Sequence, residues 1–179
     1  FQNPTRPIGS FMDEEQANWI GAAAALERAL GHAFRDPALL RAALTHPSHR
    51  FEASGDVDNQ RLEFLGDAVL GFLLADRIFR GPEEHPEGML TVLRASVASG
   101  AALAAKARTL ALGPALLLGR GEALTGGRDR DSDLADAFEA VLGAVYVDGG
   151  IAAVSDVFDR LFAADLEHLG RDPWIDNPK

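Results

Sequence analysis

The chain has 179 residues, of which 47% are hydrophobic, with a formal net charge of −10 and no cysteine. This length and apolar content suit one folded domain and exclude an intrinsically disordered chain. The lack of cysteine excludes disulfides, thiolate metal sites and cysteine nucleophiles, and it fits a reducing, cytoplasmic setting. The negative charge by itself argues against nucleic-acid binding, which usually needs a basic surface.

Helical signals follow one another along the chain, and the alternating patterns typical of strands are missing. Helices are predicted over residues 13–30, 37–46, 59–79, 86–98, 100–112, 133–148 and 151–170. Turns, breaks or loops are predicted at residues 31, 48–58, 81–82, 113–114, 118–132 and 149–150. Asp36 and Pro37, for example, indicate the start of the helix 37–46, because Asp is a favoured N-cap and Pro suits the first helical position. The predicted fold class is therefore all-α.

The domain boundaries are less well marked than the helices. Residues 1–11 are interpreted as an expression leftover or a disordered N-terminus, and residues 12–170 as the folded domain. The apolar runs are short or are interrupted by charges, so no transmembrane helix and no membrane partner are expected. The segment 118–127 is rich in glycine, but it lacks the GxxxxGK[ST] spacing of a phosphate-binding loop. No nucleotide cofactor is expected.

Two pairs of acidic residues lie inside apolar helical segments. Of the eighteen residues from Leu62 to Phe79, twelve are apolar and two are glycine, yet Glu63 and Asp67 lie four apart in this run. Asp136 and Glu139 lie three apart in the predicted helix 133–148. Residues at these spacings share one helix face. Helices that are apolar on their other sides are expected to be buried and to pack together, which would bring four carboxylates to one place.

Like charges that are buried together repel, and leaving them unpaired costs several kcal/mol, roughly. A shared proton, nearby arginines or a hard divalent cation could offset this cost, and the spacing alone does not choose among them. Most acid pairs on one helix simply face solvent. Mg²⁺ is the best fit to a set of oxygen ligands, because it binds carboxylates together with water and substrate phosphates. Carboxylates around Mg²⁺ would suit phosphodiester hydrolysis.

Five segments together resemble the ribonuclease III family, over roughly residues 20–165. The segment RLEFLGDAVL resembles the family's signature, and LADAFEAVLGAVYVDGG resembles its second catalytic helix. The segments LTHPS, EGMLTVLRASVAS and LGRGEALTGG fall in family-like places and in the same order. The resemblance implies an all-helical endonuclease domain that forms a homodimer and cleaves double-stranded RNA. It further implies products with 5′-phosphates and two-nucleotide 3′ overhangs, and a role in processing ribosomal and other structured RNA.

The resemblance also implies roles for individual residues. Glu63, Asp67, Asp136 and Glu139 match the family's four central carboxylates, which bind Mg²⁺, with Mn²⁺ able to substitute. Asp67 and Glu139 match the two most closely tied to catalysis. Glu87 matches a further acid that helps to place RNA or a second metal, although an acid after a proline also suits a helix N-terminus.

Other positions depart from the family pattern or allow two interpretations. Gln60 stands where many members carry Glu, and it is expected to act in RNA binding or in contacts outside the metal ligands. Asp133 either complements the dipole of its helix or adds charge to the site. His46 either reaches RNA or serves as a structural hydrogen-bonding group. Phe64 is interpreted as a residue of the dimer interface or of the core. Candidate phosphate-binding arginines are Arg61, Arg94, Arg120, Arg128 and Arg130.

The resemblance offers an explanation for the negative charge. Family members usually carry a basic double-stranded-RNA-binding domain after the nuclease domain, and residues 171–179 are interpreted as the start of a linker to such a domain. Metal binding would also offset several of the acids. Two alternatives stay open: a helical Mg²⁺-dependent nucleotide pyrophosphohydrolase, and a non-catalytic family member that dimerises and binds RNA or protein.

Overall fold

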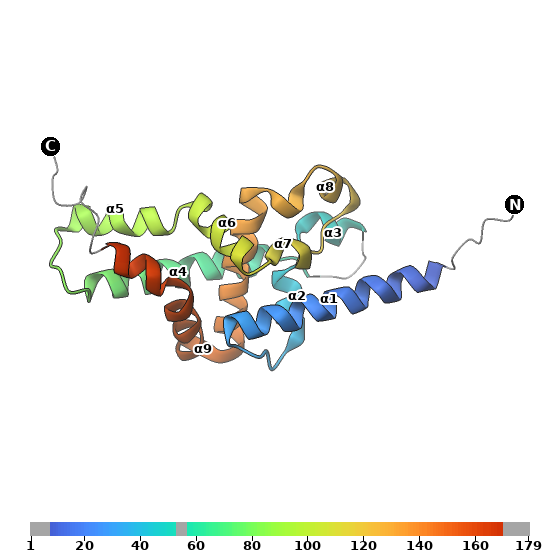
Figure 1. The fold of residues 1–179 in the computed structure, drawn as a ribbon, viewed down its shortest axis with the longest axis horizontal. Coiled ribbons are helices and arrows are strands. Elements are labelled where there is room, and N and C mark those ends of the chain that lie inside the picture. The colour runs from blue at the N-terminus through green and yellow to red at the C-terminus, as the bar shows by residue number, and fades with distance from the viewer. Residues whose placement is uncertain (1–7, 53–56, 170–179) are drawn as a thin grey trace, which may run out of the picture.

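The computed structural model describes residues 8–52 and 57–169, and within them it is helical with no strand (Figure 1). The α-helices are α1 (Ile8–Leu30), α2 (Pro37–Ala43), α3 (Pro47–Glu52), α4 (Gln60–Phe79), α5 (Glu87–Val97), α6 (Gly100–Thr109), α7 (Leu112–Ala115), α8 (Arg120–Leu124) and α9 (Asp131–Leu169), with a 3₁₀ helix η1 (Gly127–Asp129). A single parallel bridge joins Thr45 to Leu117 in this part of the chain. The predicted all-α class is confirmed.

Most predicted helices are present, and Asp36 caps α2 as expected by accepting a hydrogen bond from the Ala38 N–H at 3.0 Å. Four short helices were not predicted: α3 lies in the expected polar loop, α7 lies at the expected break at 113–114, and α8 and η1 lie in the expected glycine-rich loop. The predicted break after the helix 100–112 exists, but it lies at Leu110 and Ala111, and α7 contains Gly113 and Pro114. Proline is tolerated there because the first N–H groups of a helix have no intrahelical partner.

Helix α1 begins at Ile8, five residues before the predicted start. Residues 1–7 of the predicted N-terminal leftover lie outside the described residues. So do residues 53–56 of the predicted loop and the whole predicted linker 171–179. The predicted break at residues 149–150 is confirmed: α9 has a kink at Gly150, whose φ and ψ are not helical, between the segments predicted as helices 133–148 and 151–170. Gly150 has φ 75° and ψ −171°, a backbone conformation that residues with a side chain rarely adopt.

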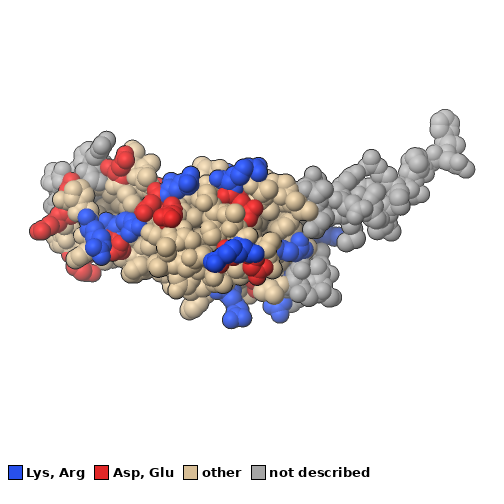
Figure 2. Space-filling model, turned by 90° about the horizontal axis from the view of Figure 1, so that it is seen from below, with Lys and Arg blue, Asp and Glu red and all other residues tan. Residues whose placement is uncertain are grey.

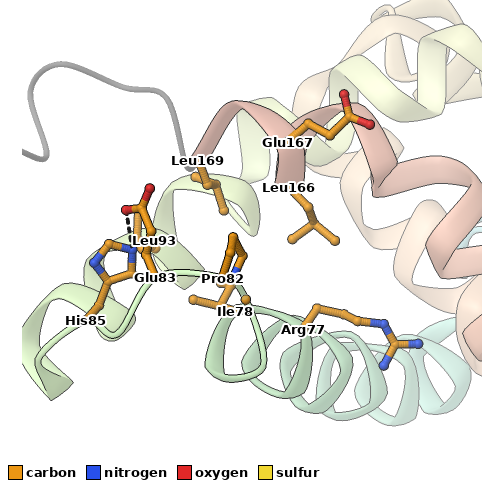
Figure 3. A pocket seen from close by; sticks show the side chains of 10 residues that line it. Arg77, Ile78, Pro82, Glu83, His85, Leu93, Leu166, Glu167 and Leu169 are labelled. Carbon is orange, nitrogen blue, oxygen red and sulfur yellow. Dashed lines mark ion pairs between the residues drawn. The ribbon is translucent and has the colours of Figure 1, made fainter.

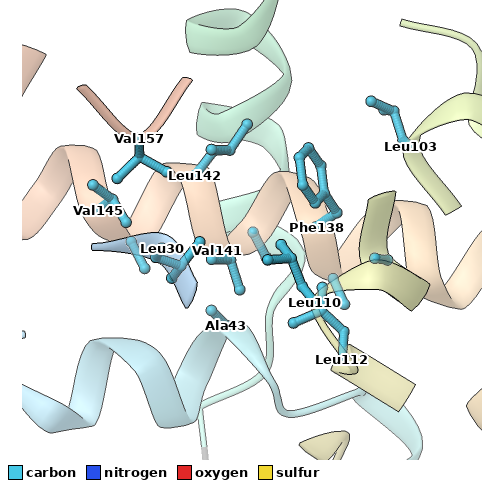
Figure 4. Packing of buried hydrophobic residues seen from close by; sticks show 14 of the residues in the cluster. Leu30, Ala43, Leu103, Leu110, Leu112, Phe138, Val141, Leu142, Val145 and Val157 are labelled. Carbon is cyan, nitrogen blue, oxygen red and sulfur yellow. The ribbon is translucent and has the colours of Figure 1, made fainter. Parts of the chain in front are cut away.

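Helices α4 and α9 pack against each other in the middle of the domain, and α9 also contacts α2 and α6. The core includes Phe138, Phe158 and Phe162, which are fully buried on α9, together with leucines from the surrounding helices. Figure 4 shows side chains of α9 meeting Leu30 of α1, Ala43 of α2 and Leu112 of α7. By length and composition α9 could cross a membrane, but its most apolar window is 56% buried within the domain. Burial in this core explains its apolar character.

Two glycines let α4 and α9 approach until their backbones touch. A Cβ atom built on Gly66 of α4 would lie 1.8 Å from the Glu139 carbonyl oxygen of α9. A Cβ atom built on Gly143 of α9 would lie 2.2 Å from the Leu62 carbonyl oxygen of α4. No real side chain fits at such distances. The crossing of the two central helices therefore depends on having no side chain at these positions.

Asp148 ties the chain before α2 to the middle of α9. Its carboxylate accepts hydrogen bonds from the backbone N–H groups of Arg35 and Asp36 at 3.1 Å, and it bonds to His32 Nε2 at 3.0 Å. Burial would raise the pKa of Asp148, but these backbone and histidine hydrogen bonds outweigh it and hold the pKa below the usual value. The carboxylate is therefore stabilised in its charged form inside the fold.

Lys106 holds α6 to the second half of α9. Its Nζ donates to the Leu161 carbonyl at 2.9 Å and to the Asp165 carboxylate at 2.5 Å, and it lies 4.3 Å from the centre of the Phe162 ring. Arg77 of α4 makes a similar link by donating to Asp159 at 2.8 Å. These bonds fix the half of α9 that follows the bend.

We expect Gly66→Ala to destabilise the protein by about 3 kcal/mol or more, the upper part of the range for overpacking a core. The added methyl group would force α4 away from the Glu139 backbone. Urea unfolding followed by circular dichroism measures the change. Gly21→Ala is the matched control, because Gly21 lies mid-helix in α1 with no atom within 4 Å of the added Cβ. It should leave stability unchanged or raise it by up to about 1 kcal/mol.

We expect Asp148→Asn to lower the free energy of unfolding by about 1–3 kcal/mol, because an amide presents fewer acceptors to the Arg35 and Asp36 N–H groups. For a chain of this size that corresponds to a fall in Tm of several degrees. The pKa of Asp148 is lowered in the fold, so its contribution is present at neutral pH and is lost as pH falls below the usual carboxyl range. Thermal unfolding of both chains at pH 7 and at pH 3 tests this. An equal difference in Tm at the two pH values would contradict the assigned role.

Candidate active site

The crossing of α4 and α9 carries all four predicted carboxylates. Glu63 and Asp67 lie one turn apart on α4, on either side of the Gly66 that touches the Glu139 backbone. Asp136 and Glu139 lie on the facing part of α9. The Glu139 side chain interacts electrostatically with the other three carboxylates. The structure thus brings together the four acids that the sequence placed on two separate helices.

The electrostatics of the cluster favour protonation when no cation is bound. Burial raises the pKa of Glu139 to about 7, and repulsion from Asp67, Asp136 and Glu63 adds to the shift. Burial together with repulsion from Asp136 and Asp67 also raises the pKa of Glu63. Every charge that shifts the pKa of Glu139 is a carboxylate, so no described arginine offsets the repulsion at this side chain. A proton or a cation is needed to offset it.

The donor set of the cluster fits a hard divalent cation, because four carboxylates offer only oxygen ligands. Along the described residues, no three His, Asp or Glu side chains converge closely enough to hold an ion as they stand. Glu63, Asp136 and Glu139 are half-buried and Asp67 is exposed. Their side chains would have to turn towards one another around an ion.

The two other predicted site residues, Gln60 and Glu87, lie at different distances from the four carboxylates. Gln60 is the exposed first residue of α4, one turn before Glu63, so it lies at the edge of the cluster. Glu87 begins α5 and lines a groove with Phe79 at the far end of α4. Phe79 is twelve residues beyond Asp67, which is about 18 Å along a helix. Within one chain, Glu87 therefore lies away from the four carboxylates.

Asp133 fits both interpretations given to it, a complement to the helix dipole and an added negative charge near the site. It lies in the first turn of α9, is buried, and accepts a hydrogen bond from Arg130 Nη1 at 3.1 Å. Its charge also raises the pKa of Asp136, second to burial, whereas the nearby His46 ring acts in the opposite direction. Asp133 thus adds negative potential to the cluster while being paired itself.

Two of the five candidate phosphate-binding arginines have structural roles. Arg128 Nη1 donates to the backbone carbonyls of Gly113 and Leu116, at 3.0 and 2.7 Å, and so holds the end of α7. Arg130 is paired with Glu122 and Asp133. Arg61, Arg94 and Arg120 are exposed on α4, α5 and α8. Local sequence could not show the role of Arg128, because its partners lie 12 and 15 residues away, whereas Asp133 is three residues from Arg130.

The charged surface is mixed, and a separate cavity lies away from the cluster. On the face in Figure 2, basic and acidic side chains are interspersed among uncharged ones, so this face is not a continuous acidic surface. Figure 3 shows the cavity between the end of α4 and the end of α9, with Ile78, Pro82 and Leu166 among its lining. None of the four carboxylates lines it.

An exposed apolar stripe runs along α4, formed by Phe64, Ala68, Phe72, Ala75 and Phe79. The three phenylalanines are 81%, 58% and 77% exposed. The expectation that α4 is buried all round was therefore wrong for the single chain, and core packing is excluded for Phe64. Phe72 and Phe79 were missed as surface residues. Phe72 follows Phe64 by eight residues, and Phe79 follows Phe72 by seven. Each interval is about two helical turns, so this spacing could have placed the three phenylalanines on one helix face.

Comparison with known proteins identifies the family. A family model described as Ribonuclease-III-like matches residues 36–166. Ribonuclease 3 of Streptomyces coelicolor is 51% identical over 142 residues, which is 79% of this chain and 51% of that protein. Ribonuclease 3 of Methylococcus capsulatus is 49% identical over 154 residues, which is 86% of this chain and 65% of that protein. The chain spans about half to two thirds of the length of these curated relatives.

The fold gives the same result. The nuclease domain of ribonuclease III from Campylobacter jejuni, described for structural flexibility in a region involved in dimer formation, superposes with a TM-score of 0.73 at 35% identity, over 79% of this chain and 96% of that one. A crystal structure of the same nuclease domain superposes with a TM-score of 0.70 at 34% identity, over 79% and 94% of the two chains. The chain belongs to the ribonuclease III family. The predicted resemblance is confirmed.

We expect the metal-free protein to lose thermal stability as pH rises from 5 to 7.5. The pKa of Glu139 is raised to about 7, so the folded state holds its proton in a range where the unfolded chain has lost it, and stability falls between about pH 4.5 and 7. Mg²⁺ should raise Tm more at pH 7.5 than at pH 5, because ligand carboxylates must be deprotonated.

Glu139→Gln is the comparison for this effect, since it keeps the shape of the side chain and removes the titrating group. Its Tm should change less between pH 5 and pH 7.5 than that of the unmodified chain. Thermal unfolding in EDTA and in Mg²⁺ measures both effects. Parallel pH profiles for the two chains would show that Glu139 does not carry the raised pKa.

Proposed function

We propose that this chain is the nuclease part of an endoribonuclease that cleaves double-stranded RNA with Mg²⁺, or with Mn²⁺ in its place. The observation that carries the proposal is the cluster of four carboxylates at the crossing of α4 and α9, in a chain that belongs to the ribonuclease III family. Residues 12–170 form the proposed nuclease unit. A cytoplasmic location and a role in processing ribosomal and other structured RNA belong to the same proposal.

Glu63, Asp67, Asp136 and Glu139 are the proposed metal ligands, with Asp67 and Glu139 the residues closest to the chemistry. Bound Mg²⁺ would supply an activated water and stabilise the negative charge that develops on the phosphate. The half-buried positions of Glu63, Asp136 and Glu139 keep bulk water partly away. The pKa values of Glu63 and Glu139 are raised by burial and by repulsion from the neighbouring acids, so a bound cation would favour the loss of their protons and make both of them charged ligands.

Hydrolysis would cleave the bond between phosphorus and the 3′-oxygen, with the incoming water in line with the leaving oxygen. The product strand then keeps a 5′-phosphate. The A-form major groove of RNA is too narrow for side chains, so the duplex is recognised by its shape, its 2′-hydroxyls and its phosphates. Gln60 lies at the edge of the cluster, where an amide can hydrogen-bond to RNA without adding charge. Glu87 is proposed to help place RNA or a second metal.

A homodimer is the proposed working form. The α4 stripe exposes three phenylalanines on the helix that also carries Glu63 and Asp67, and a second copy of the chain is the proposed partner for it. Two copies joined through α4 would hold two carboxylate clusters in a fixed relation, one for each RNA strand. Paired cuts offset along the duplex would leave the two-nucleotide 3′ overhangs.

The cleavage test uses a long, uniformly labelled RNA duplex at low salt, with Mg²⁺ or with EDTA. Low salt matters because the net charge is −10 and the chain spans only part of the relatives' length. Expected products carry 5′-phosphates and two-nucleotide 3′ overhangs. Release of pyrophosphate from nucleoside triphosphates, with RNA left intact, would instead indicate a pyrophosphohydrolase.

Glu139→Gln should lower the cleavage rate by at least about a hundredfold, because the substitution removes a charged ligand at the reacting centre. Circular dichroism and sedimentation should show an unchanged fold and oligomeric state. Glu167→Gln is the matched control: it makes the same change on α9, at an exposed position beside the distant cavity. Cleavage by Glu139→Gln at the rate of this control would overturn the site assignment.

A further inference from the structure

His46 is held by one ring nitrogen and leaves the other one open. Its Nδ1 accepts a hydrogen bond from the Ser48 backbone N–H at 3.1 Å and lies 2.8 Å from Ser48 Oγ. Ser48 Oγ itself accepts from the Gly119 N–H at 2.9 Å, so its own hydrogen is free to point to Nδ1. A nitrogen that accepts from a backbone N–H carries no hydrogen. The neutral His46 ring therefore has its hydrogen on Nε2.

The Nε2–H group has no hydrogen-bond role within the described part of the fold. None of the residues that the structure describes makes a hydrogen bond to it, and it is not among the buried atoms that lack a partner. The backbone of His46 is fixed separately, because its N–H donates to the Leu117 carbonyl at 2.9 Å. The half-buried ring is thus held in place with a hydrogen-bond donor that no described residue uses.

The packing of α2 along α9 places this donor beside the carboxylate cluster. The two helices run in opposite directions: the Asp36 N–H contacts Asp148, and Ala43 points towards Val141 (Figure 4). Both pairs move by seven residues, so the end of α2 lies beside the first half of α9, the half that carries Asp136 and Glu139. His46 follows three residues after that end. The Thr45 carbonyl also accepts from the Asn59 N–H at 2.9 Å, which ties this segment to the start of α4.

The electrostatics agree with this placement. The His46 ring lies close enough to Asp136 for its protonated, charged form to lower the pKa of that carboxyl, against the rise that burial and Asp133 produce. A cationic side chain at this place would pair with Asp136, as Arg130 pairs with Asp133, and would compete with a metal. A neutral N–H group can approach a phosphate oxygen without neutralising the carboxylates.

We propose that His46 donates a hydrogen bond from Nε2 to a phosphate oxygen of the RNA strand that lies over the four carboxylates. The inference rests on the proposed function, since it requires duplex RNA to be the substrate. His46 is then an RNA-positioning residue that holds the backbone beside Asp136 and adds no charge. Its second nitrogen serves the fold by accepting from Ser48 at the start of α3.

Two substitutions distinguish the roles of the two ring nitrogens of His46. His46→Asn keeps an acceptor near Nδ1, as in a normal Asn N-cap, and removes the Nε2–H donor. His46→Gln keeps a donor near Nε2 and loses the acceptor for the Ser48 N–H. A structural role alone predicts that His46→Gln is the more damaging change. RNA positioning predicts that His46→Asn is the more damaging change for cleavage, with its Tm unaltered.

The experiment measures kcat/KM on the RNA duplex with Mg²⁺ at low salt, and duplex binding in the Glu139→Gln background. We expect His46→Asn to lower kcat/KM and affinity roughly tenfold, the effect of one hydrogen bond to a charged group. The salt dependence of binding should keep its slope, because a neutral donor releases no counterion. His46→Gln should stay within about threefold of the unmodified chain in cleavage and have a lower Tm. His168→Asn, on the exposed end of α9, is the control.

The inference is overturned if His46→Asn cleaves and binds like the control, if its salt slope falls by about one, or if His46→Gln loses as much activity as His46→Asn. These outcomes leave the proposed function standing, because the unmodified chain still cleaves. Failure of the unmodified chain and of His168→Asn to cleave or bind duplex RNA overturns the proposed function, and the role of His46 falls with it.

Discussion

The contact between the backbones of α4 and α9 is the constraint on which the rest of the structure depends. Gly66 and Gly143 remove the side chains that would keep the two helices apart, although each glycine costs a helix roughly 1 kcal/mol relative to alanine. The gain is a crossing at which Glu63 and Asp67 face Asp136 and Glu139. The same glycines that let the core close therefore also bring the four acids together, so folding of the core and assembly of the site are one event.

Burial does not decide by itself whether a carboxylate is charged in this protein, and Asp148 and Glu139 show why. Burial acts to raise the pKa of both. Asp148 is surrounded by N–H donors from the segment before α2, and its pKa is lowered. Glu139 is surrounded by three other carboxylates, and its pKa is raised to about 7. The first arrangement stabilises the fold. The second costs stability until a cation is bound, and such a cost is typical of a site rather than of a structural ion pair.

The sequence predicted well what depends on local spacing and poorly what depends on distant partners. The long helices, the Asp36 cap and the two acid pairs follow from periodicity within one segment. The short helices α3 and α8 lie in polar segments and meet through the bond between Ser48 and Gly119, which are 71 residues apart. Arg128 is one of five candidate phosphate ligands in the sequence, but it binds carbonyls of α7 that no local pattern reveals. The same holds for Glu87, whose distance from the cluster is set by the turn between α4 and α5.

Helix α4 also explains why an apolar segment carries acids. Its apolar residues divide between two faces: Leu70, Leu73 and Leu74 enter the core, and Phe64, Phe72 and Phe79 lie on the exposed stripe. The acids occupy the face between these two, at the crossing with α9. In the proposed dimer the stripe is covered by a second copy, and α4 becomes buried nearly all round, as its composition indicates. Because one rigid helix then carries both the dimer contact and two of the ligands, the separation of the two sites, and with it the offset between the two cuts, is fixed by helix geometry and not by a flexible loop.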